Sequence, residues 1–142
     1  MSCDSRLRGR SEPINGGMSR AYCGRMSTDH RKLEAFTLAD EFAVRIYAVT
    51  RAFPADERYG VRSQIRRAAV SVPTNIVEGC GRGSDREHTR YFEMALGSAR
   101  EAIYLIGLAS RLEFVDRRTA DEITNLGNRV AAALTALKKS IT

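Results

Sequence analysis

The residues best suited to chemistry in this sequence are arginines that are spaced for one side of a helix. Arg58, Arg62 and Arg66 recur every four residues, so they share a face if the segment is helical. From residue 58 to residue 90 the chain has seven arginines, no lysine and three acids. A guanidinium group is always charged, binds phosphate through two donors and stacks on bases. We therefore predict contacts with nucleic-acid phosphates from Arg58, Arg62, Arg66, Arg67, Arg82, Arg86 and Arg90. The alternative is a solvated face that pairs with acids of neighbouring helices or subunits.

Catalytic chemistry has much less support in the sequence. Cys80 and His88 have the residue types of a nucleophile and its base, but Cys80 is more simply explained as a small loop residue. The pair Glu87–His88 lacks the Glu-x-x-His spacing of a di-iron bundle, and the other histidine, His30, lies far away in the sequence. We expect no enzymatic activity, no metal site and no cofactor.

Glycines at positions 79, 81 and 83 resemble a phosphate-binding loop only superficially. Such loops follow a strand, whereas a helical pattern precedes this one, and no Gly-Lys-Ser/Thr follows. Ser84 begins the next helix, whose free N–H groups would lie beside two of the arginines. An anion-binding or catalytic pocket in this loop is therefore a remote third hypothesis.

Four amphipathic segments must position these residues. Apolar residues recur every three or four positions in each segment, and no alternating run predicts a strand. Two capping boxes, at Ser84–Glu87 and Thr119–Glu122, are expected to begin the third and fourth helices. Short loops between the helices favour an all-α, antiparallel up-down-up-down four-helix bundle. The expected helices span 38–53, 56 or 58–79, 84–110 and 119–141.

A proline interrupts the second of these patterns. Pro73 removes a backbone donor and clashes with the carbonyl of Ala69, so we predict a kink in helix two. Asn75 and Glu78 follow the proline, and the helix is expected to end at Gly79. The kink either directs these polar residues at a partner or subunit interface, or they satisfy backbone groups around the bend.

Length and charge limit the remaining possibilities. The chain has 142 residues and a formal net charge of +6, which suits one domain with an anionic partner. Residues 1–33 are rich in Gly, Ser and Arg without apolar periodicity, and we predict a disordered basic tail followed by a bundle at 34–142. Three cysteines without C-x-x-C spacing favour the cytoplasm, and no apolar run is long enough for a membrane span.

One stretch of helix three indicates self-association. Residues 102–109 are apolar on every side, and helix four has an alanine-rich face. A helix that is apolar all round is normally buried, so we predict a homo-oligomer. A monomer with a wide core and a few exposed leucines is the alternative.

The sequence resembles a known family over residues 39–142. The motifs in register are F-P-x-x-E-R-Y-G, S-Q-I-R-R-A-A-x-S-V-P-x-N-I-x-E-G and F-x-x-x-L-G-S-x-x-E. They are similar to the ribosomal intervening-sequence, or S23-type, four-helix bundle proteins, which are related to the accessory variability determinant of diversity-generating retroelements. The resemblance implies a pentameric ring with a cationic surface. Cys80 replaces the aromatic residue that is usual after E-G, and the tail has no counterpart.

We therefore expect a non-enzymatic, cytoplasmic, oligomeric bundle that binds RNA or DNA, with structured RNA favoured, through backbone phosphates. Base reading is not expected, because no aromatic platform is evident beyond Tyr59 and Tyr91. The alternative is an accessory adaptor subunit of a retroelement reverse transcriptase.

Overall fold

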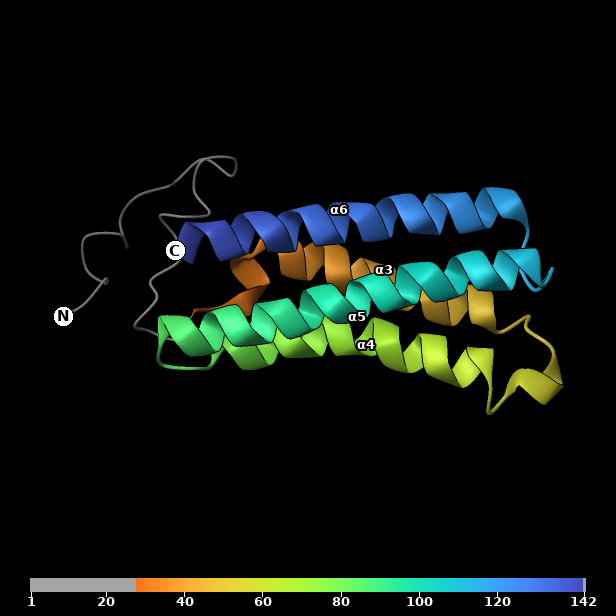
Figure 1. Ribbon diagram of the computed structural model, residues 1–142, viewed down its shortest axis with the longest axis horizontal. Coiled ribbons are helices and arrows are strands. Elements are labelled where there is room, and N and C mark those ends of the chain that lie inside the picture. The colour runs from red at the N-terminus through yellow and green to blue at the C-terminus, as the bar shows by residue number, and fades with distance from the viewer. Residues whose placement is uncertain (1–27, 142) are drawn as a thin grey trace.

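Four long helices lie side by side in the computed structural model, which describes residues 28–141 (Figure 1). No strand occurs in this part of the chain. The helices are α3 (Glu34–Thr50), α4 (Val61–Cys80), α5 (Asp85–Arg111) and α6 (Arg117–Ile141), with short 3-10 helices η1 (His30–Lys32) and η2 (Ala55–Glu57).

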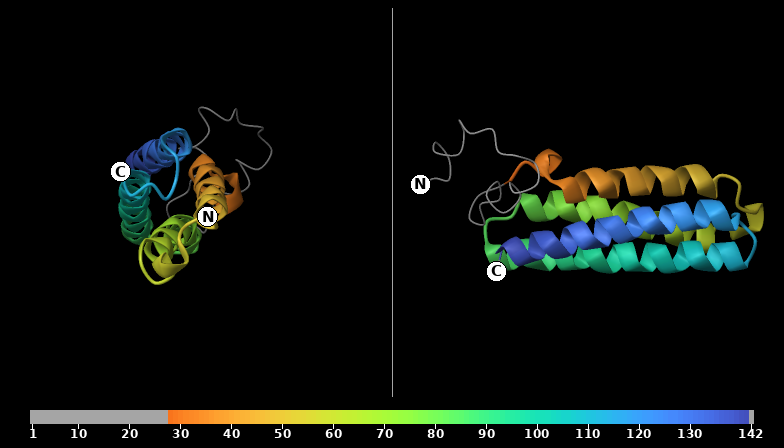
Figure 2. Two further views of the ribbon diagram at one scale, coloured as in Figure 1. Left: turned by 90° about the vertical axis from the view of Figure 1, so that its right-hand side faces the viewer. Right: turned by 90° about the horizontal axis from the view of Figure 1, so that it is seen from above.

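The helices form an antiparallel bundle. Each helix packs against its neighbours in the chain, and α6 returns to pack against α3 and closes the ring (Figure 2). Short connections join consecutive helices at alternating ends, so the α3–α4 and α5–α6 connections lie at one end and the α4–α5 loop at the other (Figure 1). The predicted all-α, up-down-up-down four-helix bundle is confirmed.

The core is built from the apolar stripes seen in the sequence. Each helix turns its apolar residues inward, where they contact one another and exclude water. The largest fully buried apolar side chains of the four helices are Phe42 and Ile46 of α3, Ile65, Val72 and Ile76 of α4, Phe92 and Ile106 of α5, and Ile123, Leu134 and Leu137 of α6.

The connection between α3 and α4 differs in detail from its prediction. α3 begins and ends earlier than expected, at Glu34 and Thr50, and Phe53 continues as a turn with its N–H bonded to the Thr50 carbonyl. α4 begins later than expected, at Val61. There the Glu57 carboxylate, which lies in η2, accepts a hydrogen bond from the Val61 N–H at 2.9 Å. This side-chain cap separates the turn at η2 from the helix proper.

One of the two predicted capping boxes was misplaced. Ser84 caps α5 as expected, because its hydroxyl accepts from the Glu87 N–H at 3.2 Å. α6 instead begins two residues before Thr119, at Arg117. Asp116 is the cap, since its carboxylate accepts from the Thr119 N–H at 2.7 Å, and this hydrogen bond lowers the pKa of Asp116. A shorter α5–α6 connection results.

The turn between α5 and α6 has a left-handed residue. Glu113 has a φ of 65°, and the Phe114 N–H reaches back to the Ala109 carbonyl at 2.9 Å. This pattern is a Schellman motif, in which glycine is the usual left-handed residue. The Phe114 ring then packs 5.6 Å from the ring of Phe53, which ties the two connections at this end together.

α4 continues through Pro73 as an unbroken helix. The Asn75 amide donates to the carbonyl and the hydroxyl of Ser71, at 2.8 and 2.9 Å, so it satisfies groups of its own helix. Gly79 is buried, and a Cβ there would lie 2.9 Å from the Tyr91 Cβ and 3.1 Å from Phe92 Cε1, so only glycine allows α5 this close. The kink itself stays a prediction.

The predicted tail falls mostly outside the described residues, since positions 1–27 lie there. Its last residues contact the bundle: the Thr28 N–H donates to the Cys80 carbonyl at 3.0 Å, and Leu33 is buried.

Candidate nucleic-acid interface

Four of the seven predicted arginines surround one depression between α3 and α4. It has a volume of about 450 Å³ and lies at the end of the bundle where these two helices are joined. Tyr47 of α3 forms one side, and α4 with the residues just before it forms the rest. We call this surface the arginine hollow; it is lined by Tyr47, Arg58, Arg62, Ser63, Arg66, Arg67 and Val70.

Arg66 is held in place within the arginine hollow by its own chain. Its Nε donates to the hydroxyl of Thr50 at 2.7 Å, and a terminal nitrogen donates to the Tyr47 carbonyl at 3.3 Å. Its guanidinium carbon lies 4.5 Å from the centre of the Tyr47 ring, a cation–π contact. Three contacts therefore fix one flat cation against one aromatic ring.

The arginine hollow is a site of uncompensated positive charge. None of its lining residues is acidic, and across residues 28–141 no carboxylate forms an ion pair with any of its four arginines. Arg58 and Arg67 are exposed, and Arg62 is half-buried. Their nearby side-chain contacts are long and involve uncharged groups: Arg58 lies 5.6 Å from the Tyr59 ring centre, and Arg67 lies 3.5 Å from the Ser63 hydroxyl. Such a concave cationic surface attracts anions.

The other three predicted arginines lie at the opposite end of α4. We call Arg82, Arg86 and Arg90 the loop cluster, because they flank the α4–α5 loop. Arg82 is already paired, with Glu78 at 2.7 Å and the Tyr91 hydroxyl at 2.8 Å, and its guanidinium lies 4.9 Å from the Tyr91 ring centre. Arg86 and Arg90 are exposed on the first turns of α5. The 13 residues of α4 after Arg67, about 20 Å of helix, separate the two groups.

The α4–α5 loop does not have the properties of a catalytic site. Cys80 is the last residue of α4 and is 1% exposed, and burial, with a smaller contribution from Asp29, raises the pKa of its thiol to about 11. A thiol that stays protonated at neutral pH is a poor nucleophile. His88 is buried, and its Nε2 lies 2.7 Å from the Arg82 carbonyl, so it positions the loop. Within residues 28–141 no three His, Cys, Asp or Glu side chains are grouped to hold a metal ion.

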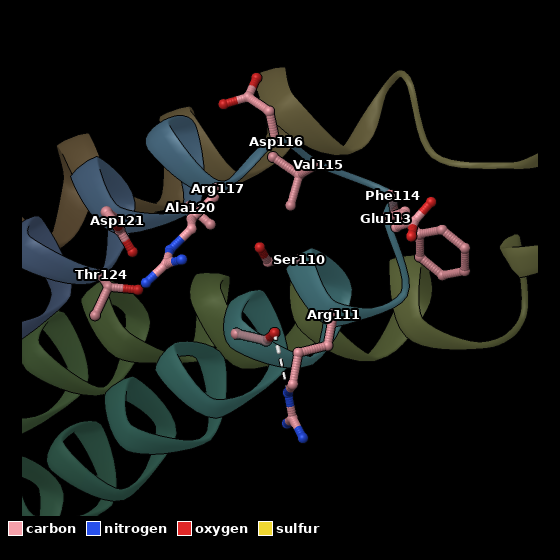
Figure 3. A pocket seen from close by; sticks show the side chains of 11 residues that line it. Ser110, Arg111, Glu113, Phe114, Val115, Asp116, Arg117, Ala120, Asp121 and Thr124 are labelled. Atoms are coloured by element: carbon pink, nitrogen blue, oxygen red, sulfur yellow. Dashed lines mark hydrogen bonds between the residues drawn. The ribbon is translucent and has the colours of Figure 1, made fainter.

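Two other depressions have mixed charge. The larger, about 730 Å³, lies where α5 meets α6, and Figure 3 shows the side chains from both helices and from their connection that line it. Arg111 and Arg117 share it with the acids Glu113, Asp116 and Asp121. The other lies between α4 and α5, where Arg67 is accompanied by an acid, Glu101. Neither favours a polyanion as the arginine hollow does.

The outer surface of the bundle keeps some apolar side chains. In the predicted all-apolar stretch of α5, Leu105 and Ile106 are buried, whereas Tyr104 is 60% exposed. Val44 of α3 is 63% exposed and Met94 of α5 is 44% exposed. No helix of residues 28–141 combines the length and apolar character needed to cross a membrane.

Two residues that hold Arg66 in place, one on the lining of the arginine hollow and one buried behind it, were missed in the sequence. Tyr47 and Thr50 lie near the end of α3, and their importance depends on contacts with Arg66, 16 to 19 residues later. A usable signal did exist: Tyr47 falls beside the apolar stripe rather than on it, as an exposed aromatic would. The short connection between α3 and α4 then brings Tyr47 to the same end of the bundle as the arginines.

Comparison with known proteins supports the predicted relationship. The model of the 23S rRNA-intervening sequence protein family matches residues 31–136, which is most of the chain. The chain belongs to this family. Among solved structures, it is similar to a protein of unknown function from the S23 ribosomal protein family of Bacteroides thetaiotaomicron, at 25% identity and a TM-score of 0.69. That match covers 74% of this chain and 98% of the other. No curated protein matches the chain.

Proposed function

We propose that this member of the 23S rRNA-intervening sequence family is a non-enzymatic, cytoplasmic protein that binds structured RNA through its backbone phosphates. The observation that carries the proposal is the arginine hollow, which four arginines line and where none of them forms an ion pair with a carboxylate of residues 28–141. Phosphate contacts of this kind supply most of the sequence-independent affinity of proteins for nucleic acid.

Self-association would strengthen such binding. The predicted homo-oligomer, a pentamer by resemblance, would place several arginine hollows on one assembly, so that weak contacts of each subunit add through effective concentration. Tyr104 and Met94 of α5 are exposed, and we expect apolar positions of this kind to lie at the subunit contacts.

An adaptor role is the second candidate. Val70 lines the arginine hollow and Val44 is exposed on the neighbouring helix α3, so apolar and cationic contacts lie on the same two helices. A protein partner such as a reverse transcriptase would use both kinds of contact, whereas a phosphate backbone would use only the arginines.

Salt dependence of RNA binding tests the proposal. Fluorescence anisotropy of a labelled RNA between about 50 and 200 mM salt should give a logarithmic slope of about −0.7 to −0.9 per phosphate contacted. The double variant Arg62→Glu/Arg67→Glu should lower the affinity on the order of 30-fold, since two phosphate contacts are lost and repulsion is added.

The matched control has the same change in charge elsewhere. Arg100 of α5 and Arg129 of α6 are exposed and lie outside the arginine hollow, so Arg100→Glu/Arg129→Glu should change the affinity only slightly. Equal losses of RNA affinity in the two double variants would mean that net charge alone causes the effect. The arginine hollow would then not be the binding surface.

A further inference from the structure

The fixed guanidinium of Arg66 distinguishes the arginine hollow from an ordinary basic patch. We propose that the hollow takes a nucleotide unit, with its base stacked on the plane formed by Arg66 and Tyr47 and its phosphates on Arg58, Arg62 and Arg67. This inference rests on the proposed function and specifies its ligand: unpaired nucleotides, as opposed to the outside of a duplex.

The hydrogen bonds of Arg66 decide its role. Its Nε and one terminal nitrogen are committed to Thr50 and to the Tyr47 carbonyl, so fewer donors remain for a phosphate. What the side chain offers to a ligand is its flat face, which is supported from behind by the Tyr47 ring at 4.5 Å. Arginine planes and aromatic rings are the surfaces on which proteins stack unpaired bases.

The other walls of the arginine hollow suit the rest of a nucleotide. Val70 adds an apolar wall, and Ser63 adds a hydroxyl for a polar edge. Arg58, Arg62 and Arg67 make no ion pair with a described residue and supply the charge for phosphates. The volume of about 450 Å³ falls in the range of about 300–1,000 Å³ typical of small-ligand sites.

This geometry predicts that the arginine hollow prefers nucleotides that are not base-paired. A base inside a duplex is stacked and paired, so a duplex would reach the arginine hollow only with its phosphates. A single strand, a bulge or a free nucleotide can insert its base. The shared chemistry is therefore a planar base joined to phosphate, which RNA and free nucleotides both provide.

The decisive experiment measures the affinities for one RNA sequence as a single strand and as a duplex, with Arg66→Lys as the variant. Lysine keeps the charge and removes the plane, so the single-strand affinity should fall about tenfold while the duplex affinity stays nearly unchanged. Arg62→Lys is the matched control, because Arg62 lies over no aromatic ring of residues 28–141, and it should affect both RNAs alike. Circular dichroism verifies that the variants are folded.

Photocrosslinking gives an independent result with the unmodified protein. RNA containing 4-thiouridine should crosslink to the tryptic peptide 46–51, which contains Tyr47, or to residues 58–70. Crosslinks confined to residues 82–90 would overturn the inference.

Further outcomes separate the two proposals. If the protein binds neither RNA, the proposed function fails and the inference fails with it. If both RNAs bind equally and Arg66→Lys changes nothing, phosphate binding stands and base insertion is overturned.

A competition experiment identifies the source of the nucleotide. Displacement of RNA by ATP and not by inorganic triphosphate supports a base site open to free nucleotides. Displacement only by single-stranded RNA supports an RNA site. Equal displacement by triphosphate and ATP would overturn the inference.

Discussion

The arginine hollow and the loop cluster have the same chemical group at opposite ends of α4, but their surroundings differ. In the hollow, four arginines line one depression and Arg66 lies over the Tyr47 ring, with no acid on the lining. In the loop cluster, Arg82 is held by Tyr91 and Glu78, and both raise its pKa. Spacing along the sequence made the two groups look alike, whereas their partners make one a candidate binding surface and the other partly a structural contact.

A second difference is rigidity. Arg66 is fixed by three contacts that join α3 to α4, so the arginine hollow has a preformed wall. Arg86 and Arg90 project from the exposed first turns of α5. A preformed site loses less conformational freedom when a ligand binds, and this favours the hollow beyond its charge.

The largest expected effect comes from reversing charge at the two ends in parallel. Arg86→Glu/Arg90→Glu should lower RNA affinity only about fivefold, against the roughly 30-fold loss expected for Arg62→Glu/Arg67→Glu, because the exposed pair makes looser phosphate contacts. Anisotropy at one salt concentration measures both. A larger loss at the loop cluster would invert the comparison and place the binding surface at the other end of the bundle.

A smaller effect is expected from the support behind Arg66. Thr50→Val keeps the shape of the side chain but removes the oxygen that accepts from Arg66 Nε at 2.7 Å. We expect the free energy of unfolding to fall by about 1–3 kcal/mol, since a charged donor loses its partner, and single-stranded RNA affinity to fall about three- to tenfold. Urea unfolding and anisotropy give the two values.

The control for this substitution is Thr135→Val. The Thr135 hydroxyl donates only to the Ala131 carbonyl, on an exposed face of α6. It should change neither quantity by much. If Thr50→Val also left RNA affinity unchanged, the fixed position of Arg66 would have no part in binding.

Most of the fold could be predicted from the sequence, because apolar spacing is a local signal that each helix carries in full. The ends of the helices were less predictable, since several residues compete for each cap. Asp116 and Thr119 both have capping side chains, and the structure uses the aspartate, whose carboxylate is the stronger acceptor. α3 likewise ends at Thr50, before Phe53, at a point that the apolar periodicity does not report.

The candidate site could be predicted only in part. The positions of the arginines follow largely from the sequence, because helical spacing places Arg62 and Arg66 on one side of α4. Arg58, which the spacing also assigned to this helix, lies in the turn before it. The division of the arginines into two groups depends on which acids lie near, and the role of Tyr47 depends on how α3 packs on α4. Those contacts join residues that are far apart in the chain, so they cannot be predicted from the local patterns of one sequence.

Breaking the ion pair of Arg82 with Glu78 is expected to raise RNA affinity, whereas the charge reversals lower it. Glu78→Gln removes the carboxylate that lies 2.7 Å from Arg82 and should free that guanidinium for phosphate. We expect RNA affinity to rise about two- to threefold, with little change in stability, since exposed ion pairs contribute about 0–1 kcal/mol. Combining it with Arg82→Gln should cancel the gain. The double variant has the net charge of the unmodified protein, so a gain that persists in it would not come from Arg82 and would leave the pairing irrelevant.

The smallest effect on binding is expected at Cys80, beside the loop cluster. Cys80→Ala should leave RNA affinity unchanged, because the thiol is buried and faces no ligand surface. Its ionisation does affect stability. Burial raises the pKa of the folded thiol from 9.0 to about 11, so the folded state favours the protonated form. The stability that the protonated thiol contributes to the folded state is therefore fully present below pH 9 and is lost as the pH rises toward 11. Urea unfolding at both pH values should show a steeper loss of stability in the unmodified protein than in Cys80→Ala, and parallel losses would mean that the thiol ionises as freely in the folded chain as in the unfolded one.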